Sequence, residues 1–334
     1  MKNVLLTGGT GFVGANLALR LLREGHRVAL LVRPGRATWR IQSFADAVVL
    51  VEADLTEATS VAEAVRSVRP DWIFHLAAYG AYPHQRDLRT MQETNVAGLV
   101  NLVDAGLRDG FEAFVNAGSS SEYGYKDFPP SEAELVEPNS DYAWTKASAT
   151  QFCRSTAQRR DVYLPTLRLY SVYGPYEEPS RFLPSLIARG LRGELPPLAD
   201  ASVARDFVYI DDVCDAFVRV ATNRSPDPGA VYNVGTGVQS TLADVVEIAR
   251  RRLPIRGEPS WGSMPNRSWD TSTWVANNAK IRSVLDWLPR HSLDEGFGNF
   301  VDWFGANPGL AAVYDAGRAP LRVDVSSSSR GAGI

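Results

Sequence analysis

A tyrosine and a lysine stand four residues apart in Tyr142-Ala143-Trp144-Thr145-Lys146. In a helix this spacing places both side chains on one face. A free tyrosine has a pKa near ~10 and is a poor base at neutral pH, but an adjacent ammonium group favours the phenolate. The pair could therefore transfer a proton as a general acid or base. The same spacing also occurs in ordinary surface helices.

A serine-rich turn lies earlier in the chain. The apolar run 114–117 leads into Gly118-Ser119-Ser120-Ser121-Glu122-Tyr123-Gly124. If this run is a strand of a parallel sheet, the turn lies at the carboxyl edge of the sheet, where open α/β folds bind ligands. A serine hydroxyl there could hydrogen bond to a substrate oxygen and help to pass on its proton. Alternatively, the serines only form the turn.

A glycine-rich turn follows the first apolar run. Gly8, Gly11 and Gly14 have the spacing G-x-x-G-x-x-G, between a predicted strand and a predicted helix that begins near Val13. Glycines permit a sharp turn, a close approach of backbone N–H groups to a pyrophosphate, and close packing of the helix on the sheet. The anion would lie at the positive end of that helix. An ordinary tight turn is the alternative, but this context predicts dinucleotide binding.

The residues after the second predicted strand bear on the choice of dinucleotide. Arg33 is followed by Arg36 and Arg40, and no carboxylate occurs before Asp46. An acidic residue there would bind the ribose 2′-OH of NAD, whereas an arginine accommodates the 2′-phosphate of NADP. The sequence favours NADP(H), with NAD(H) as the alternative. The arginines could also form only a solvated basic loop.

The elements that must position these residues alternate between strand-like and helix-like patterns. Short apolar runs without polar alternation suit strands that are buried on both faces of a parallel sheet, and amphipathic helical segments separate them. This order predicts an α/β fold with a doubly wound parallel (Rossmann) sheet. The predicted strands are 4–7, 28–32, 47–51, 72–76, 114–117, 166–172, 207–210 and 231–234, and the predicted helices include 15–24, 58–68, 94–109 and 141–160.

The remaining segments predict a smaller, mostly helical substrate-binding lobe that is rich in Pro and Trp. Residues 1–175 and about 206–236 would form the dinucleotide-binding domain. Residues about 176–205 and 237–318 would form the lobe that binds the substrate. Residues 319–334 have the composition of a flexible tail.

Composition narrows the class of protein. The chain has 334 residues, 45% of them hydrophobic, which is ordinary for a globular protein of one large or two joined domains. A net charge of -3 argues against a nucleic-acid or anionic-membrane partner. No apolar stretch reaches the ~20 residues of a membrane span, and no signal-peptide pattern is present, so we expect a cytoplasmic protein. Cys153 and Cys214 lack metal-site or disulfide spacing, and no metal is expected.

Together, these motifs resemble the extended short-chain dehydrogenases/reductases, in the branch of nucleotide-sugar epimerases and dehydratases. The resemblance covers the chain to about residue 305, and its landmarks occur in the family's order. Besides the glycine turn, the serine turn and the Tyr142/Lys146 pair, they are Asp54-Leu55, His75-Leu76-Ala77-Ala78, Asn95-Val96-Ala97-Gly98 and the segments 167–175, 205–213 and 232–237.

The resemblance implies roles for individual residues. Tyr142 would be the general acid or base and Lys146 its partner, which also holds the nicotinamide ribose. Ser119 falls on the family's catalytic serine or threonine, with Ser120 as the alternative. The residues expected around the dinucleotide are Gly8, Gly11, Phe12, Val13, Gly14, Arg33, Arg36, Asp54, Leu55, Leu76, Ala77, Ala78, Asn95, Tyr142, Lys146 and Tyr170.

A nucleotide-diphosphate sugar is the implied substrate. Arg205 and Arg267 would bind its diphosphate through charge-assisted hydrogen bonds, although the residues around Arg267 depart from the family's usual pattern. Arg181, Asn233 and Ser120 are further candidates in the same pocket. The resemblance also implies a homodimer that pairs two helices of each subunit, about 87–109 and 141–160.

Three reactions at C4 of the sugar compete. A 4-epimerase returns the hydride to the other face, a 4,6-dehydratase also eliminates water, and a 4-ketoreductase consumes NADPH. Dehydratases usually carry an acid pair after the catalytic serine or threonine, where this chain has Ser120 and Ser121, with Glu122 displaced by one.

Because the arginine loop suits NADPH, the sequence favours an NADPH-dependent 4-reductase of a nucleotide-linked 4-keto-6-deoxysugar. The first alternative is a 4-epimerase with tightly bound NAD, and the 4,6-dehydratase comes next. A non-catalytic dinucleotide sensor is a remote alternative, because such proteins tend to lose the Tyr/Lys pair, which is present here.

Overall fold

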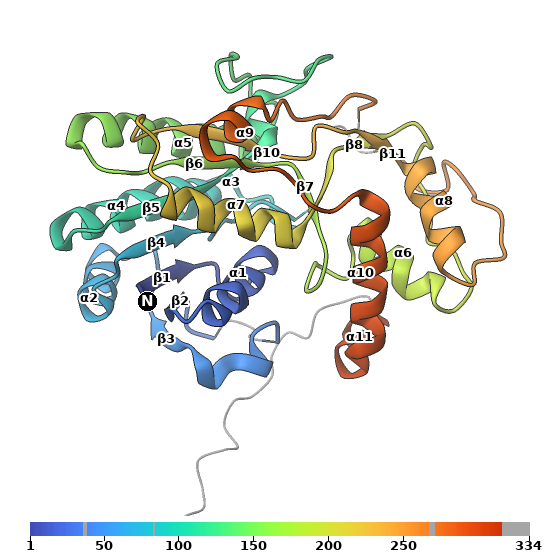
Figure 1. The fold of residues 1–334 in the computed structure, drawn as a ribbon, viewed down its shortest axis with the longest axis horizontal. Helices are drawn as coiled ribbons and strands as arrows, with labels where there is room; N and C mark the ends of the chain where they lie inside the picture. The colour runs from blue at the N-terminus through green and yellow to red at the C-terminus, as the bar shows by residue number, and fades with distance from the viewer. Residues whose placement is uncertain (36–38, 83, 267–270, 316–334) are drawn as a thin grey trace, which may run out of the picture.

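The computed structural model describes residues 1–35, 39–82, 84–266 and 271–315 (Figure 1). Seven strands form one parallel sheet in the order β10-β6-β5-β4-β1-β2-β3. Because the order runs outward from β1 in both directions, this is the doubly wound Rossmann sheet that the sequence predicted. The strands are β1 Asn3–Thr7, β2 Arg27–Val32, β3 Val49–Glu52, β4 Trp72–His75, β5 Ala113–Ser119, β6 Thr166–Leu169 and β10 Val231–Val234.

Helices cover both faces of this sheet (Figure 1). Successive side chains of β1 point to opposite faces, so Val4 and Leu6 join one hydrophobic cluster and Leu5 joins the other. The first cluster includes helices α1 Phe12–Arg23 and α7 Ile210–Thr222, and the second includes α2 Ala58–Val68, α4 Gly98–Asp109 and α5 Asp141–Arg160. Burial on both faces explains why the strands read as continuous apolar runs.

The predicted strand 166–172 is wrong as a single element. The chain leaves the central sheet at Tyr170, and β7 Ser171–Tyr173 pairs instead with β9 Phe207–Tyr209 in a separate two-stranded sheet. The cause is a change of partner: Tyr170 N–H still donates to the carbonyl of Val234, whereas Ser171 N–H donates to the carbonyl of Asp206. The predicted strand 207–210 therefore lies outside the central sheet.

Two other predicted boundaries also move. The predicted helix 94–109 starts earlier, with α3 Leu88–Gln92. Asp87 is the N-cap residue of α3, and its carboxylate accepts the N–H of Thr90 at 2.7 Å. A π-helical turn, η2 Glu93–Ala97, joins α3 to α4, and it shifts the helical periodicity by one residue. The predicted strand 47–51 starts only at Val49, after the 3₁₀ helix η1 Gln42–Ala47.

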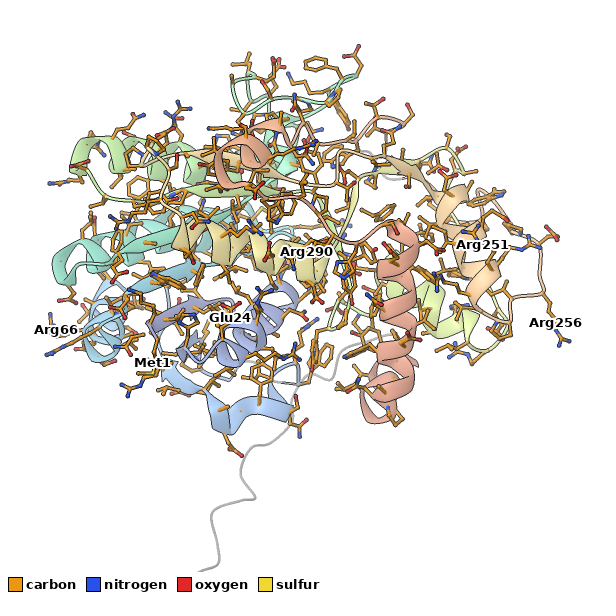
Figure 2. The ribbon with its side chains drawn as sticks, in the orientation of Figure 1. Met1, Glu24, Arg66, Arg251, Arg256 and Arg290 are labelled. Atoms are coloured by element: carbon orange, nitrogen blue, oxygen red, sulfur yellow. The ribbon has the colours of Figure 1, made fainter. Side chains whose placement is uncertain are left out.

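A second lobe lies beside the carboxyl edge of the sheet, at the right of Figure 1. In Figure 2 the labelled Arg251 and Arg256 mark its outer end, opposite Arg66 of the sheet domain. Its helices pack on one another through the contacts α6–α8, α8–α10 and α6–α11. The remaining elements are η3 Ser120–Tyr123, α6 Phe182–Gly190, β8 Ala204–Arg205, β11 Ser240–Thr241, α8 Leu242–Arg252, α9 Ala279–Leu285, α10 Leu293–Ala306 and α11 Pro308–Asp315.

The predicted flexible tail, 319–334, lies outside the described residues. Across the ranges that the structure describes, none of the helices has the length and apolarity to cross a membrane. Cys153 and Cys214 are both buried free thiols.

Candidate functional site

The glycine turn lies directly against the end of β4. Gly8 has a φ of +71°, and a Cβ atom there would lie 2.6 Å from the backbone nitrogen of Ala77. A Cβ atom on Gly14 would lie 2.2 Å from the carbonyl oxygen of Gly8. Both positions therefore require glycine, the first for its backbone conformation and the second for close packing of α1 on the turn.

The first turn of α1 presents unpaired backbone N–H groups. Gly11 is the N-cap residue and supplies no side-chain cap, and the first turn contains no acidic residue. The N–H groups of the first turn, from Phe12, Val13 and Gly14, have no partner within the helix. Together with the positive end of the helix, they suit an anion such as the pyrophosphate of a dinucleotide.

A buried histidine joins the ends of β1 and β4. His75 pairs with Thr7 in the parallel ladder, and His75 Nδ1 and Thr7 Oγ1 share a hydrogen bond of 2.8 Å. Burial lowers the pKa of His75 to about 3, with a further contribution from the charge of Lys146. The ring is therefore neutral near pH 7, and it holds Thr7, whose hydroxyl accepts the N–H of Ala77 at 3.3 Å.

Ser119 ends β5 and begins the serine turn. Its backbone N–H donates to Glu122 Oε1 at 2.8 Å, and its hydroxyl accepts the N–H of Ser121 at 3.2 Å. These two bonds form a capping box for η3. The Ser119 side chain also lies close enough to Tyr142 to lower the pKa of its phenol, so the structure brings together the serine and the tyrosine that the sequence singled out.

Tyr142 lies in the first turn of α5. Ser140 caps this helix by accepting the N–H of Ala143 at 3.2 Å, which fixes where the helix starts. Burial, together with the carboxylate of Glu122, raises the pKa of Tyr142 to about 12. Arg181 and the Ser119 side chain partly oppose this rise in the pKa of Tyr142. The phenol is therefore protonated at neutral pH in this state of the protein, and Arg181 is a nearby cation that favours its deprotonation.

Lys146 is buried one helical turn after Tyr142, with 4% of its surface exposed. Burial lowers the pKa of Lys146, whereas the charge of Glu122 raises it. The sequence predicted that this ammonium would act on Tyr142. In the structure, the carboxylate of Glu122 acts on both residues, and it raises the pKa of each.

Glu122 is fully buried and holds several elements together. Its Oε1 accepts the hydroxyl of Thr150 at 3.0 Å as well as the N–H of Ser119, and its Oε2 pairs with Arg168 Nε at 2.9 Å. Burial raises the pKa of Glu122, whereas Arg168 and Lys146 lower it. The sequence left open whether this carboxyl serves as an acid in elimination, but its oxygens are directed at partners within the core.

Asn95 fixes the loop after β4 against α5. Its Nδ2 donates to the carbonyl of Tyr79 at 2.8 Å and to Thr145 Oγ1 at 3.0 Å, and its Oδ1 accepts the N–H of Tyr79 at 2.8 Å. Asn95 lies in the π-helical turn, a feature that often occurs at functional sites. It was predicted to line the dinucleotide, and in the structure it positions the loop 77–82 next to the helix of Tyr142.

A tryptophan that the sequence analysis missed covers the serine turn. Trp274 Nε1 donates to Ser120 Oγ at 3.2 Å, and the guanidinium of Arg205 lies 5.5 Å from the centre of the indole ring. Asp206 anchors this segment by accepting the N–H of Ala276 at 3.0 Å. Ser120 and Arg205 thus meet at Trp274, and only the abundance of Trp in the second lobe hinted at this residue.

The arginines after β2 fall into different environments. Arg33 directly follows β2 and is exposed, and Arg36 lies outside the described residues. Arg40 is buried, donates to the carbonyl of Tyr176 at 2.7 Å, and pairs with Glu178 at 3.0 Å. The expectation of a solvated basic loop is therefore wrong for Arg40, whose charge is engaged by the second lobe.

Asp54 and Leu55 follow β3. Asp54 Oδ1 accepts the N–H and the hydroxyl of Thr56, at 3.0 and 2.8 Å, in a local turn. Leu55 is buried, and a Cβ atom on Gly98 would lie 2.9 Å from its Cβ. Both residues follow the carboxyl end of β3, and they remain predicted contacts of the dinucleotide.

Two expected site residues, Asn233 and Tyr170, are buried within the protein. Asn233 accepts the hydroxyl of Tyr123 at 2.8 Å and donates to the carbonyls of Pro130 and Asn277, at 2.9 and 3.0 Å. These side-chain groups of Asn233 have protein partners, and its role in binding substrate stays a prediction. The ring of Tyr170 is buried, and its hydroxyl has no hydrogen-bond partner among the described residues. Arg267 lies outside the described residues.

A glycine turn at the switch point of a doubly wound sheet, with a serine close to a tyrosine and a buried lysine one helical turn after the tyrosine, defines a short-chain dehydrogenase/reductase. Residues 4–235 match the family model described as the NAD dependent epimerase/dehydratase family. The chain belongs to this family, whose members are enzymes.

Individual relatives agree with this assignment. The UDP-glucose 4-epimerase of Mycolicibacterium smegmatis is 31% identical, over 90% of this chain and 97% of the relative. The structure of a UDP-glucose 4-epimerase from Thermotoga maritima with UDP-glucose superposes with a TM-score of 0.83 at 25% identity, covering 92% of this chain and 99% of the other. MoeE5, solved with UDP-glucose and NAD, gives a TM-score of 0.79 at 30% identity, with coverages of 92% and 99%.

Proposed function

We propose that this chain is an NAD-dependent 4-epimerase of a nucleoside-diphosphate hexose. One observation carries the proposal: the Ser119 side chain lies close enough to Tyr142 to lower the pKa of its phenol, while Ser120 and Ser121 occupy the positions where a dehydratase would carry acids. Glu122, the one carboxyl in that turn, is committed to Ser119, Thr150 and Arg168. The site is therefore equipped to move a proton at one sugar oxygen, but not to eliminate water from C5 and C6.

A bound nicotinamide ring would supply the redox chemistry by accepting a hydride from C4 of the sugar and returning it to the opposite face. Tyr142 would accept the proton of the C4 hydroxyl and later return it, while the Ser119 hydroxyl hydrogen bonds to the same oxygen. The cation of Arg181 favours the phenolate form of Tyr142. Lys146 would hold the nicotinamide ribose, and the N–H groups at the start of α1 would bind the pyrophosphate.

Arg205 would bind the diphosphate of the substrate. Arg205 is the last residue of β8, which pairs with β11. Its guanidinium lies beside the ring of Trp274, whose Nε1 donates to Ser120. A guanidinium at this position can form a charge-assisted fork with phosphate oxygens. The relatives solved with UDP-glucose support a uridine nucleotide as the first substrate to test.

Arg33 supports a second candidate, the NADPH-dependent 4-ketoreductase. It follows β2 directly, where an arginine would accept the 2′-phosphate of NADP. The two candidates differ in what the purified protein contains. An epimerase that recycles its cofactor retains NAD, whereas a reductase releases NADP⁺ after each turnover.

The experiment is to denature the purified protein and identify the released dinucleotide by mass spectrometry. The native protein is then incubated with UDP-glucose without added cofactor, and the products are separated by chromatography. Retained NAD and the appearance of UDP-galactose would support the epimerase. An empty protein that consumes NADPH only with a 4-keto sugar nucleotide would replace it with the reductase.

Tyr142→Phe tests the chemistry directly. Loss of a general acid–base group costs about 10²- to 10⁴-fold in turnover, whereas the dinucleotide should still be retained. Full turnover by this variant would contradict the role of Tyr142 in both candidates. A wild-type protein that retains dinucleotide but turns over no sugar nucleotide would favour the dinucleotide sensor.

We also propose that two copies pair through the helices within 87–109 and 141–160. The outer face of α5 is hollowed along Trp144, Gln151, Phe152 and Arg159, and Trp144 is 46% exposed. Trp144→Glu should shift the mass measured by light scattering from that of a dimer to that of a monomer. A wild-type protein that is monomeric at micromolar concentration would contradict the proposal.

A further inference from the structure

Arg181 reaches from the second lobe into the proton-transfer site. It is the N-cap residue of α6, and its Nη2 donates to the carbonyl of Ala81, in the loop after β4, at 2.9 Å. The guanidinium lies 5.6 Å from the centre of the Tyr82 ring. Because this cation also lowers the pKa of Tyr142, the position of Arg181 affects how readily Tyr142 loses its proton.

The turn that precedes Arg181 is held in an unfavourable backbone conformation. Tyr176 has a φ of 68°, in the left-handed region that an L-residue occupies at a cost of about 1–3 kcal/mol. Such a conformation persists only when its surroundings hold it. The Tyr176 ring lies between two indoles, with ring centres 6.3 Å from Trp39 and 5.2 Å from Trp303.

Arg40 clamps both ends of this turn. Its Nε donates to the carbonyl of Tyr176 at 2.7 Å, and its Nη2 pairs with Glu178 Oε2 at 3.0 Å. The guanidinium also stacks on Trp39, 4.2 Å from the ring centre. From Glu178 the backbone continues to the site, because Arg181 N–H donates to the carbonyl of Glu178 at 2.9 Å. One arginine of the dinucleotide domain thus fixes the segment that carries Arg181.

We propose that Arg40 is a positioning residue for the reaction: by fixing the Tyr176–Glu178 turn, it sets where the Arg181 guanidinium stands beside Tyr142. The inference rests on the proposed function for its kinetic consequences, but not for the geometry itself. Arg40 belongs to the loop after β2 that also carries Arg33. The clamp therefore connects the side of the domain that would bind the adenosine ribose with the proton-transfer site.

The consequence for pH follows from the groups around Tyr142. Glu122 and Tyr82 raise its pKa, whereas Arg181 and the Ser119 side chain lower it. Around Arg40, the facing groups are Glu178, Glu177, Tyr82 and Tyr314. If the clamp is released and Arg181 withdraws, the pKa of Tyr142 rises. The rising limb of kcat/KM against pH then moves to higher pH.

The test uses Arg40→Gln, Arg181→Gln and the double variant, with Arg219→Gln as the matched control. Arg219 also binds a carboxylate and a backbone carbonyl, at Asp215 (2.8 Å) and Asp286 (2.9 Å), but on the far end of α7. The first readout is the Nε–H resonance of Arg181 in ¹⁵N-labelled protein, assigned by its absence in Arg181→Gln. The second is kcat and KM against pH with UDP-glucose.

We expect Arg40→Gln to move the Arg181 resonance and to lower kcat by about 10- to 100-fold, as small misplacements near a reacting centre do. The rising limb of kcat/KM against pH should shift to higher pH in Arg40→Gln and in Arg181→Gln. The kcat of the double variant should be no lower than that of the poorer single variant. Arg40→Lys retains the charge but lacks the fork, so it should fold and still move the resonance.

An unchanged Arg181 resonance in Arg40→Gln and Arg40→Lys, or additive kinetic effects of the two substitutions, would overturn the inference. Equal resonance shifts in Arg219→Gln would overturn it too, because the effect would then be general. If the wild-type protein turns over no sugar nucleotide, the proposed function fails, while the resonance still decides whether Arg40 positions Arg181.

Discussion

Arg168 and Glu122 form an ion pair of 2.9 Å, with side chains that are 6% and 0% exposed. Arg168 lies on β6, next to Gly118 of β5 and Asn233 of β10 in the ladder, and its guanidinium stacks on Tyr123 at 4.4 Å. Because Glu122 also holds Ser119 and Thr150, this pair ties the central sheet to the serine turn and to α5.

Arg168→Met should destabilise the protein by about 3–5 kcal/mol, because it leaves the carboxylate of Glu122 buried without its partner. The double variant Arg168→Met/Glu122→Gln should recover part of this loss, since no unpaired charge remains. Urea unfolding of both single variants, Arg168→Met and Glu122→Gln, of the double variant and of the wild type measures the coupling. A double variant as unstable as the sum of the single variants would contradict the coupling.

Gly14→Ala should weaken dinucleotide binding and stability, because the added methyl group would lie 2.2 Å from the Gly8 carbonyl oxygen. Overpacking of this kind costs about 1–3 kcal/mol, so binding should fall by about 5- to 150-fold. Gly305→Ala is the control, because its methyl group would have nothing within 4 Å and it lies in a helix, α10. Equal losses in both variants, measured by isothermal titration with NAD, would refute the argument.

Ser119→Ala and Ser120→Ala should distinguish the roles of the two adjacent serines in the reaction. The first variant removes the hydroxyl that lies beside Tyr142 and lowers the pKa of its phenol, and kcat should fall about 10²- to 10³-fold, as for the loss of one transition-state donor. The second removes the acceptor of Trp274 and should act mainly on KM. Steady-state kinetics with UDP-glucose decides, and a larger loss of kcat in Ser120→Ala would transfer the catalytic role to Ser120.

Glu177 should make stability fall as the pH rises from about 5 to about 8. This carboxyl is buried, and burial raises its pKa to about 8, although Arg181 opposes the rise. Between the ordinary glutamate pKa and about 8, the folded state binds more protons than the unfolded state, so unfolding becomes easier as pH rises through this window. Glu177→Gln should flatten the pH dependence between about pH 5 and 8, measured by urea unfolding. Glu134→Gln, at an exposed position, should leave it unchanged.

Patterns within one element were sufficient for much of the architecture. The helices 58–68 and 141–160 match α2 and α5, because periodic apolar residues and the cap at Ser140 define them locally. The glycine turn was also recognisable, since its φ and its packing at Gly8 and Gly14 exclude other residues. These features depend on neighbours that are close in sequence.

The failures at Tyr170, Arg40 and Glu122 depend on contacts between distant residues. Nothing near Tyr170 marks the point at which the strand changes partners, because the deciding acceptors are the carbonyls of Val234 and Asp206. Arg40 was placed in a solvated loop or with the cofactor, since its acceptors at Tyr176 and Glu178 are far along the chain. Glu122 resembled a displaced acid until its partner Arg168 came into view.

The pairing of β10 with β6 has a consequence for synthesis on the ribosome. β6 ends at Leu169, but the strand that covers its outer edge begins only at Val231. Until that later strand has emerged, a nascent chain exposes the N–H and C=O groups of β6 as a template for intermolecular strand pairing. Truncated chains that end near residue 200 should therefore aggregate, whereas chains that extend past Val234 can close the sheet.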